Sequence, residues 1–206
     1  MPVTPAELAT IEACIKTNKL NILATRATTL SPVLILDIPS IASLQAILPV
    51  LSALADKRSA EAEKLTVSVA ENSEPFADLS SVDAAILLRL VGPQFKVMED
   101  TKDDFVMRIG ASYTVADLDE DLFKKGLITS TSSLNRSLTV TQLLCNAGHG
   151  TGRNQPAFGG LIRALRLCLS SGKIVRITSE HPLFKAIVAG HLGVFGVVID
   201  VELECV

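Results

Sequence analysis

Hydrophobic positions recur along this 206-residue chain in two different periods. Spacings of three and four residues are typical of helices that bury one face, whereas alternation of apolar and polar residues is typical of half-buried strands. Helical spacing predicts helices over 4–17, 40–55, 80–91, 114–125, 159–170 and 182–189. Alternation predicts strands over 19–25, 32–38, 65–71, 94–100, 104–112, 137–145, 173–179 and 194–206.

Several of these elements carry end signals of their own. Thr4 and Glu7 have the spacing of a capping box, with Pro5 at the first helical position. A second helix is bounded by Thr114 at its start and by Gly126 after its end. The uncharged stretch 38–55 contains prolines and serines, so we expect a kinked core helix there rather than a membrane span.

The order of the elements predicts the fold class. The hairpin expected over 94–112 argues against a purely doubly wound topology, while strand and helix alternate in the last third of the chain. We therefore predict an α+β fold, a mixed sheet with several amphipathic helices, partly α/β in its C-terminal third. We expect a single domain over 1–206, with a subdivision into an acidic part, 1–123, and a basic β-α-β part, 124–206.

Composition adds an expectation about assembly. Hydrophobic residues make up 48% of the chain and aromatic residues only 4%, so the core is aliphatic. A surplus of aliphatic residues in a chain of this size favours burial between subunits. The four cysteines form no metal-binding or disulfide pattern, and we interpret them as buried, reduced residues.

The charge is divided unevenly along the sequence. The net charge is −3, but the block 124–185 holds nine basic residues and one acid, Glu180. A basic block within an acidic protein is typical of a surface that binds a polyanion. The alternative is that these cations pair with carboxylates of the acidic part, within one subunit or across a subunit boundary.

We select seven residues of this block as candidates for nucleic-acid or phosphate binding. They are Arg136, His149, Arg153, Arg163, Arg166, Lys173 and Arg176. On the helix expected over 159–170, Arg163 and Arg166 lie three residues apart and so point the same way. The block contains few aromatic rings, so binding would occur through the phosphate backbone and would not depend on base sequence.

The segment NAGHGTGRN, residues 146–154, is the clearest local motif. Its alternating glycines allow backbone amides to approach an anion closely. No Gly-Lys-Ser/Thr follows, so it is not a Walker A loop, and Arg153 stands where a dinucleotide fingerprint needs glycine. Two interpretations stay open: a phosphate-binding turn, or a loop ordered by a neighbouring molecule.

The sequence gives little support for a catalytic site or a metal site. Cys145 precedes His149 by four residues, but the sequence suggests no orienting acid, and we interpret the pair as a structural thiol and a loop histidine. The three histidines are scattered, so no metal site and no catalytic residue is predicted.

These features together favour a self-assembling structural protein that packages nucleic acid, as viral coat and nucleocapsid subunits do. Its expected partners are further copies of itself, in a shell or filament, and RNA bound independently of sequence. The hypothesis includes no cofactor and no membrane, and it favours a non-enzymatic role without excluding an enzyme. The expected location is the cytoplasm or a virion. The N-terminus shows no signal peptide, so we do not expect secretion.

Two alternatives remain. The first is a cytosolic α/β enzyme, or a nucleotide- or phosphate-binding domain, that uses the segment 146–154. The second is a protein-interaction module whose basic patch meets an acidic partner.

Overall fold

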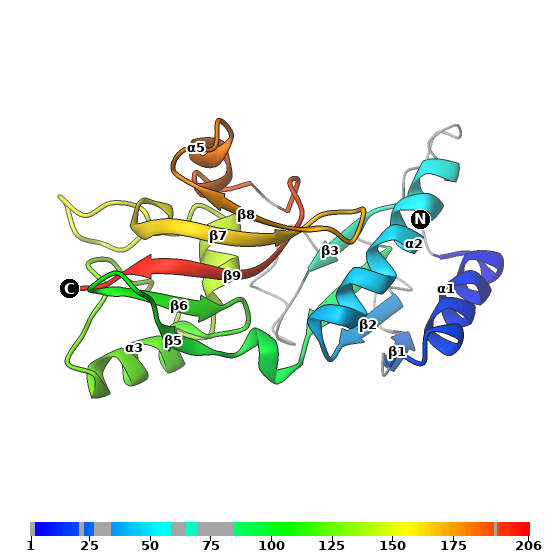
Figure 1. Cartoon of the computed structure of the whole chain (residues 1–206), viewed down its shortest axis with the longest axis horizontal. Coiled ribbons are helices and arrows are strands. Elements are labelled where there is room, and N and C mark those ends of the chain that lie inside the picture. Colours follow the sequence, from blue (N-terminus) through cyan, green and yellow to red (C-terminus); the bar gives the residue numbers. More distant parts are fainter. Residues whose placement is uncertain (1–2, 21–22, 27–33, 59–64, 70–84, 192) are drawn as a thin grey trace. The chain divides into compact units, whose positions relative to one another are not determined.

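The computed structural model describes residues 3–20, 23–26, 34–58, 65–69, 85–191 and 193–206. The chain forms two compact units (Figure 1). Unit 1 comprises residues 1–93 with 168–174, and unit 2 comprises 94–167 with 175–206. This division falls near residue 93, well before the boundary at residue 123 that the charge pattern suggested.

Unit 1 contains a four-stranded mixed sheet. Its helices are α1 (Pro5–Thr17) and α2 (Ile41–Arg58), and its strands are β1 (Leu23–Arg26), β2 (Leu34–Ile38), β3 (Val67–Val69) and β4 (Ile86–Leu90). The strand order is β1-β2-β4-β3, in which β1 pairs with β2 antiparallel while β4 pairs with β2 and β3 in parallel.

Helix α1 has the predicted capping box, whereas helix α2 is one continuous helix across Pro49, where the sequence predicted a kink. Thr4 and Glu7 form the capping box of α1, and the guanidinium of Arg58 reaches both carboxylate oxygens of Glu7 at 2.5 Å. Helix α2 runs on through Pro49 and buries Leu44, Ile47, Leu48, Leu51 and Leu54. None of the described helices is long and apolar enough to cross a membrane.

Unit 2 contains a five-stranded sheet of order β5-β6-β9-β7-β8. Strand β6 pairs antiparallel with both β5 and β9. The strands are β5 (Met98–Asp100), β6 (Val106–Gly110), β7 (Ile162–Cys168), β8 (Ile174–Thr178) and β9 (Val197–Glu204). The helices are α3 (Val115–Lys124), α4 (Val140–Cys145) and α5 (Phe184–Val188), with 3-10 turns η1 (Pro93–Phe95) and η2 (Phe158–Leu161). The predicted α+β class with a mixed sheet is therefore confirmed.

Three predicted elements are wrong. Residues 86–90 form strand β4 where a helix was expected over 80–91; residues 80–84 of that range lie outside the described part. Residues 140–145 form helix α4 instead of a strand. Thr139 and Gln142 make a capping box at its start, whereas the β-branched residues of this segment had favoured a strand. Residues 162–168 form strand β7 instead of a helix, and they lie beside β9 in the sheet.

Candidate functional site

The glycine turn, residues 146–154, begins where helix α4 ends. Ala147 has a φ of 53°, a left-handed conformation that turns the chain away from the helix axis. The amide of Gly148 then donates to the carbonyl of Leu143 at 2.7 Å, and the amide of Phe158 donates to the carbonyl of Gly148 at 2.8 Å. Backbone hydrogen bonds thus hold the start of the turn, while residues 151–157 are exposed.

The loop over residues 128–136 supports the middle of the turn. The amide of Gly150 donates to Oγ1 of Thr131 at 3.1 Å, and Thr131 is only 4% exposed. A Cβ at position 150 would lie 2.7 Å from the carbonyl oxygen of Ser132 and from the Thr131 hydroxyl. Only glycine fits this contact without displacing the backbone.

A buried histidine lies against the end of α4. His191 is 5% exposed, and its Nδ1 accepts a hydrogen bond from the amide of Gly193 at 3.1 Å. Nε2 therefore carries the ring hydrogen, and it lies 3.5 Å from Sγ of Cys145. Burial lowers the pKa of His191, which favours the neutral ring.

The glycine turn offers unused hydrogen-bond donors. The amides of His149, Thr151, Gly152, Arg153 and Asn154 donate to no acceptor within the described part of the chain. The guanidinium of Arg153 is exposed and has no carboxylate partner among the described residues. Free backbone amides and an unpaired guanidinium are both groups that can contact an anion.

The structure distributes the seven candidate residues unevenly. His149 and Arg153 share the glycine turn, where Nδ1 of His149 donates to the Gly150 carbonyl at 2.9 Å. Lys173 belongs to unit 1, apart from the other six. The four remaining arginines each face a carboxylate of unit 2: Arg136 with Asp119, Arg163 with Glu204, Arg166 with Asp200, and Arg176 with Glu202.

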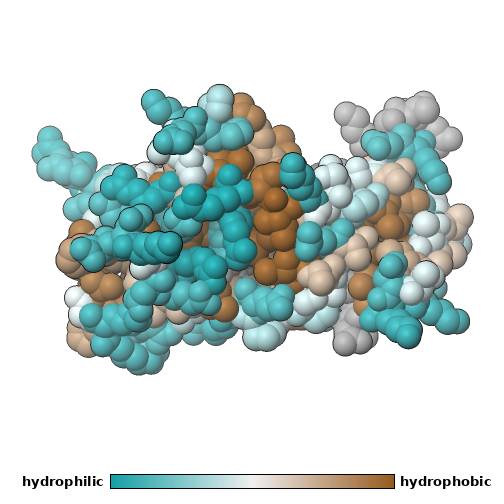
Figure 2. All heavy atoms as spheres, viewed as in Figure 1, coloured by the Kyte–Doolittle hydropathy of each residue, from teal (hydrophilic) through white to brown (hydrophobic). Residues whose placement is uncertain are grey.

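Three of these ion pairs lie on one face of the unit 2 sheet. Asp200, Glu202 and Glu204 alternate along β9, as the sequence predicted, and their partners come from β7 and β8. Buried and exposed residues do not alternate regularly along β7, because two neighbours, Ala164 and Leu165, are both buried. Arg163 and Arg166, on either side of this pair, therefore both lie on the face that carries the β9 carboxylates. Hydrophilic residues cover this part of the molecule in Figure 2. These arginines neutralise neighbouring carboxylates, which was the alternative explanation of the basic block.

The expectation that Arg163 and Arg166 lie on a helix is wrong, because they lie on strand β7. Sequence reasoning also missed Thr131 and His191, which contact the turn and its helix from distant parts of the chain. The local signal in the sequence was a pair of glycines on either side of His191, at 190 and 193. Both have positive φ in the structure, a conformation that favours glycine.

The fold of this chain is found in several oxidoreductases. A chitooligosaccharide oxidase matches 96% of the chain with a TM-score of 0.74 and 15% identity. A xylooligosaccharide oxidase from Myceliophthora thermophila matches 95% with a TM-score of 0.73 and 13% identity. Phl p 4.0202, a glucose dehydrogenase, matches 84% with a TM-score of 0.68 and 12% identity. The chain spans 43%, 43% and 34% of these proteins respectively.

No family model and no curated protein matches the chain by sequence. The shared fold nevertheless corrects the interpretation of the chain as a viral coat or nucleocapsid subunit that packages RNA, because the solved structures that share it include two oligosaccharide oxidases and a glucose dehydrogenase. Each unit buries aliphatic residues of its own, and assembly with further copies of the chain stays a prediction.

Proposed function

We propose that this chain is the cofactor-binding part of an oxidoreductase that uses a flavin dinucleotide to oxidise a hydroxyl group of a carbohydrate. The fold it shares with two oligosaccharide oxidases and a glucose dehydrogenase supports this class of reaction. Oxidation of an alcohol to a carbonyl removes a hydride and a proton. Such enzymes take up the hydride on a redox cofactor such as a flavin.

The observation that carries the proposal is the glycine turn with its free amides and Arg153. A flavin dinucleotide contains a pyrophosphate group, and that group needs several donors and a positive charge. The amides over 151–154 and the unpaired guanidinium of Arg153 supply both. The residues present therefore fit the phosphate part of such a cofactor.

Each residue around the turn has a distinct role in this proposal. Thr131 positions Gly150 and so fixes the orientation of the amides that follow it. Arg153 binds phosphate directly. His191 and Cys145 hold the end of α4, from which the turn departs. The bound flavin would supply the hydride acceptor, and the chain's own residues would hold it in place.

Titration of the full chain with FAD, followed by flavin fluorescence, tests the proposal. Riboflavin is the control ligand, because it has the same ring system without the pyrophosphate. We expect FAD to bind at least about tenfold more tightly than riboflavin, a difference of about 1.4 kcal/mol. Equal affinities, or no binding of FAD, would overturn the proposal.

Replacement of Gly150 by valine adds a second test. The added side chain would collide with Ser132 and Thr131, so we expect it to displace the amides and weaken FAD binding. A circular dichroism spectrum that matches the wild type shows that the variant is folded. FAD affinity that survives in a folded Gly150→Val protein would remove the turn from the site.

A further inference from the structure

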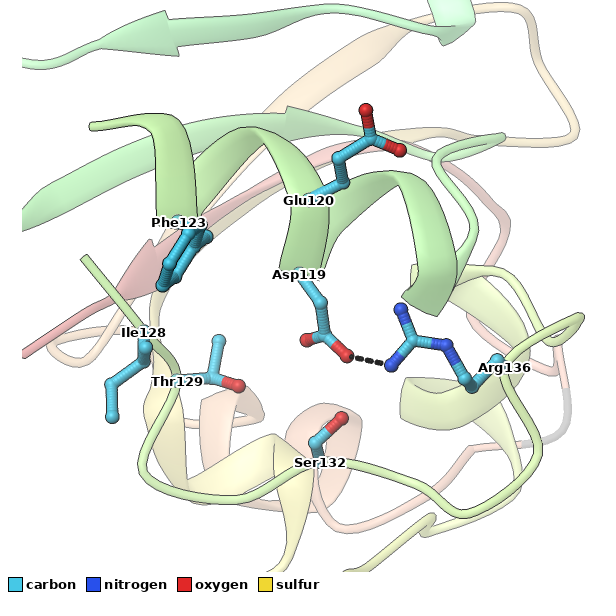
Figure 3. A pocket seen from close by; sticks show the side chains of 7 residues that line it. All are labelled: Asp119, Glu120, Phe123, Ile128, Thr129, Ser132 and Arg136. Carbon is cyan, nitrogen blue, oxygen red and sulfur yellow. Dashed lines mark hydrogen bonds and ion pairs between the residues drawn. The ribbon is translucent and has the colours of Figure 1, made fainter. Parts of the chain in front are cut away.

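Unit 2 also contains a cavity that the proposed phosphate site does not use. It has a volume of about 350 Å³ and lies between helix α3 and the loop 128–136 (Figure 3). Its lining residues are Asp119, Glu120, Phe123, Ile128, Thr129, Ser132 and Arg136. Cavities that bind small ligands measure about 300–1,000 Å³, so this one suits a small molecule.

The charged side chains of the cavity are already paired with one another or with a neighbour. Nη1 of Arg136 lies 2.8 Å from Oδ2 of Asp119, as the dashed line in Figure 3 shows. Glu120 lies 2.9 Å from Nζ of Lys124. A charged ligand would have to compete with these pairs, so the cavity favours a neutral one.

One wall of the cavity is apolar and accessible. The ring of Phe123 stands beside Ile128 in Figure 3, and these residues are 77% and 58% exposed. An exposed aromatic ring at the edge of a cavity offers a flat surface on which an apolar face of a ligand can stack.

The other lining residues supply hydrogen-bonding groups. In the described part of the chain, the hydroxyls of Thr129 and Ser132 make no hydrogen bond to a protein group. Oδ1 of Asp119 and the remaining guanidinium nitrogens of Arg136 are also unused. The cavity thus combines donors and acceptors with an apolar ring among its lining residues.

We propose that this cavity binds a neutral saccharide of one or two pyranose rings. A pyranose ring has a face of C–H bonds, which would stack on Phe123, and a rim of hydroxyls, which both donate and accept hydrogen bonds. Thr129, Ser132, Asp119 and Arg136 meet those hydroxyls. This inference rests on the proposed function for its ligand class but not on the proposed cofactor, because the cavity uses a different set of groups and cellobiose binding is measured without FAD.

Saturation-transfer NMR and calorimetry on the full chain with cellobiose test this inference. We expect saturable binding to the wild type and a loss of about tenfold in Phe123→Ala, as is typical when a stacked aromatic ring is removed. Phe105→Ala is the matched control, because Phe105 is 62% exposed but does not line the cavity. Its affinity for cellobiose should equal that of the wild type.

A second variant distinguishes specific saccharide binding from nonspecific hydrophobic binding to the apolar residues. Thr129→Val with Ser132→Ala keeps the apolar wall and removes both hydroxyls, so cellobiose should bind several-fold more weakly. The inference is overturned if cellobiose does not bind, if Phe123→Ala binds it as well as the wild type, or if the cation spermidine binds in its place with the same dependence on Phe123.

Discussion

The amide of Gly150 donates a hydrogen bond to the buried hydroxyl of Thr131, 19 residues earlier in the chain. This contact joins the glycine turn to the loop 128–136, and the amides of residues 151–154 have no acceptor among the described residues. If the turn holds a cofactor phosphate, its affinity depends on this single side-chain hydrogen bond. The contact therefore connects the local structure with the proposed function.

Thr131→Val should lower the affinity for FAD by about tenfold, because valine keeps the volume of threonine but leaves Gly150 without its acceptor. Thr129→Val is the matched control, since Thr129 lies on the same loop and makes no contact with Gly150. Fluorescence titration measures both. Equal affinities in the two variants would show that the hydrogen bond does not organise the turn.

Arg153→Ala should weaken FAD binding by about tenfold and leave riboflavin binding unchanged, because the lost interaction is with phosphate. The side chain is exposed and has no partner within the described residues, so thermal stability should not change. Lys173→Ala is the control for a general loss of positive charge, because Lys173 lies outside the glycine turn. If both variants lose the same affinity, Arg153 has no specific role.

The stability of unit 2 should decrease in mild acid because of His191. Burial lowers its pKa below the ordinary value of 6.5, so the unfolded chain takes up a proton at a higher pH than the folded one. Protonation would also place a hydrogen on Nδ1, where the amide of Gly193 already donates. The free energy of unfolding should therefore fall as the pH drops below about 6.5.

Urea unfolding at several pH values checks this expectation. His191→Gln should show a flatter pH dependence than the wild type, while His149→Gln, at an exposed position, should follow the wild type. A wild-type stability that does not change between about pH 7.5 and 5.5 would contradict the proposed role of the buried ring.

Asp200→Asn should destabilise the protein by about 2 kcal/mol, because Asp200 is 2% exposed and accepts a hydrogen bond from Nε of Arg166 at 2.9 Å. Glu204→Gln should cost less than about 1 kcal/mol, since its ion pair with Arg163 is exposed to solvent. Chemical denaturation compares the two. Similar losses would mean that burial does not determine the strength of these pairs.

Sequence reasoning succeeded where local chemistry decides the structure. The caps at Thr4 and Thr114 placed α1 and α3 correctly, and the alternation along β9 identified its polar face. It failed where contacts between residues far apart in the sequence determine whether a segment is a helix or a strand. Leucine spacing over 159–170 fits a helix as well as a strand, and pairing within the sheet selects the strand.

The candidate site was only partly predictable for the same reason. The motif 146–154 places His149 and Arg153 together without any tertiary information. Thr131 and His191 reach the turn and its helix only through the fold, so no spacing in the sequence reveals them. The ion pairs on β9 likewise depend on strand order, which is why the three arginines paired there resembled a surface for nucleic acid.

The chemical shifts of backbone amides during titration with FAD test the central claim most directly. Amide signals of Thr151, Gly152 and Arg153 should shift in a saturable manner, while that of Gly126, at the end of α3, should stay in place. Riboflavin at the same concentration should leave the three signals unchanged. If FAD binds but these amides do not respond, the glycine turn is not the phosphate site and the account is wrong.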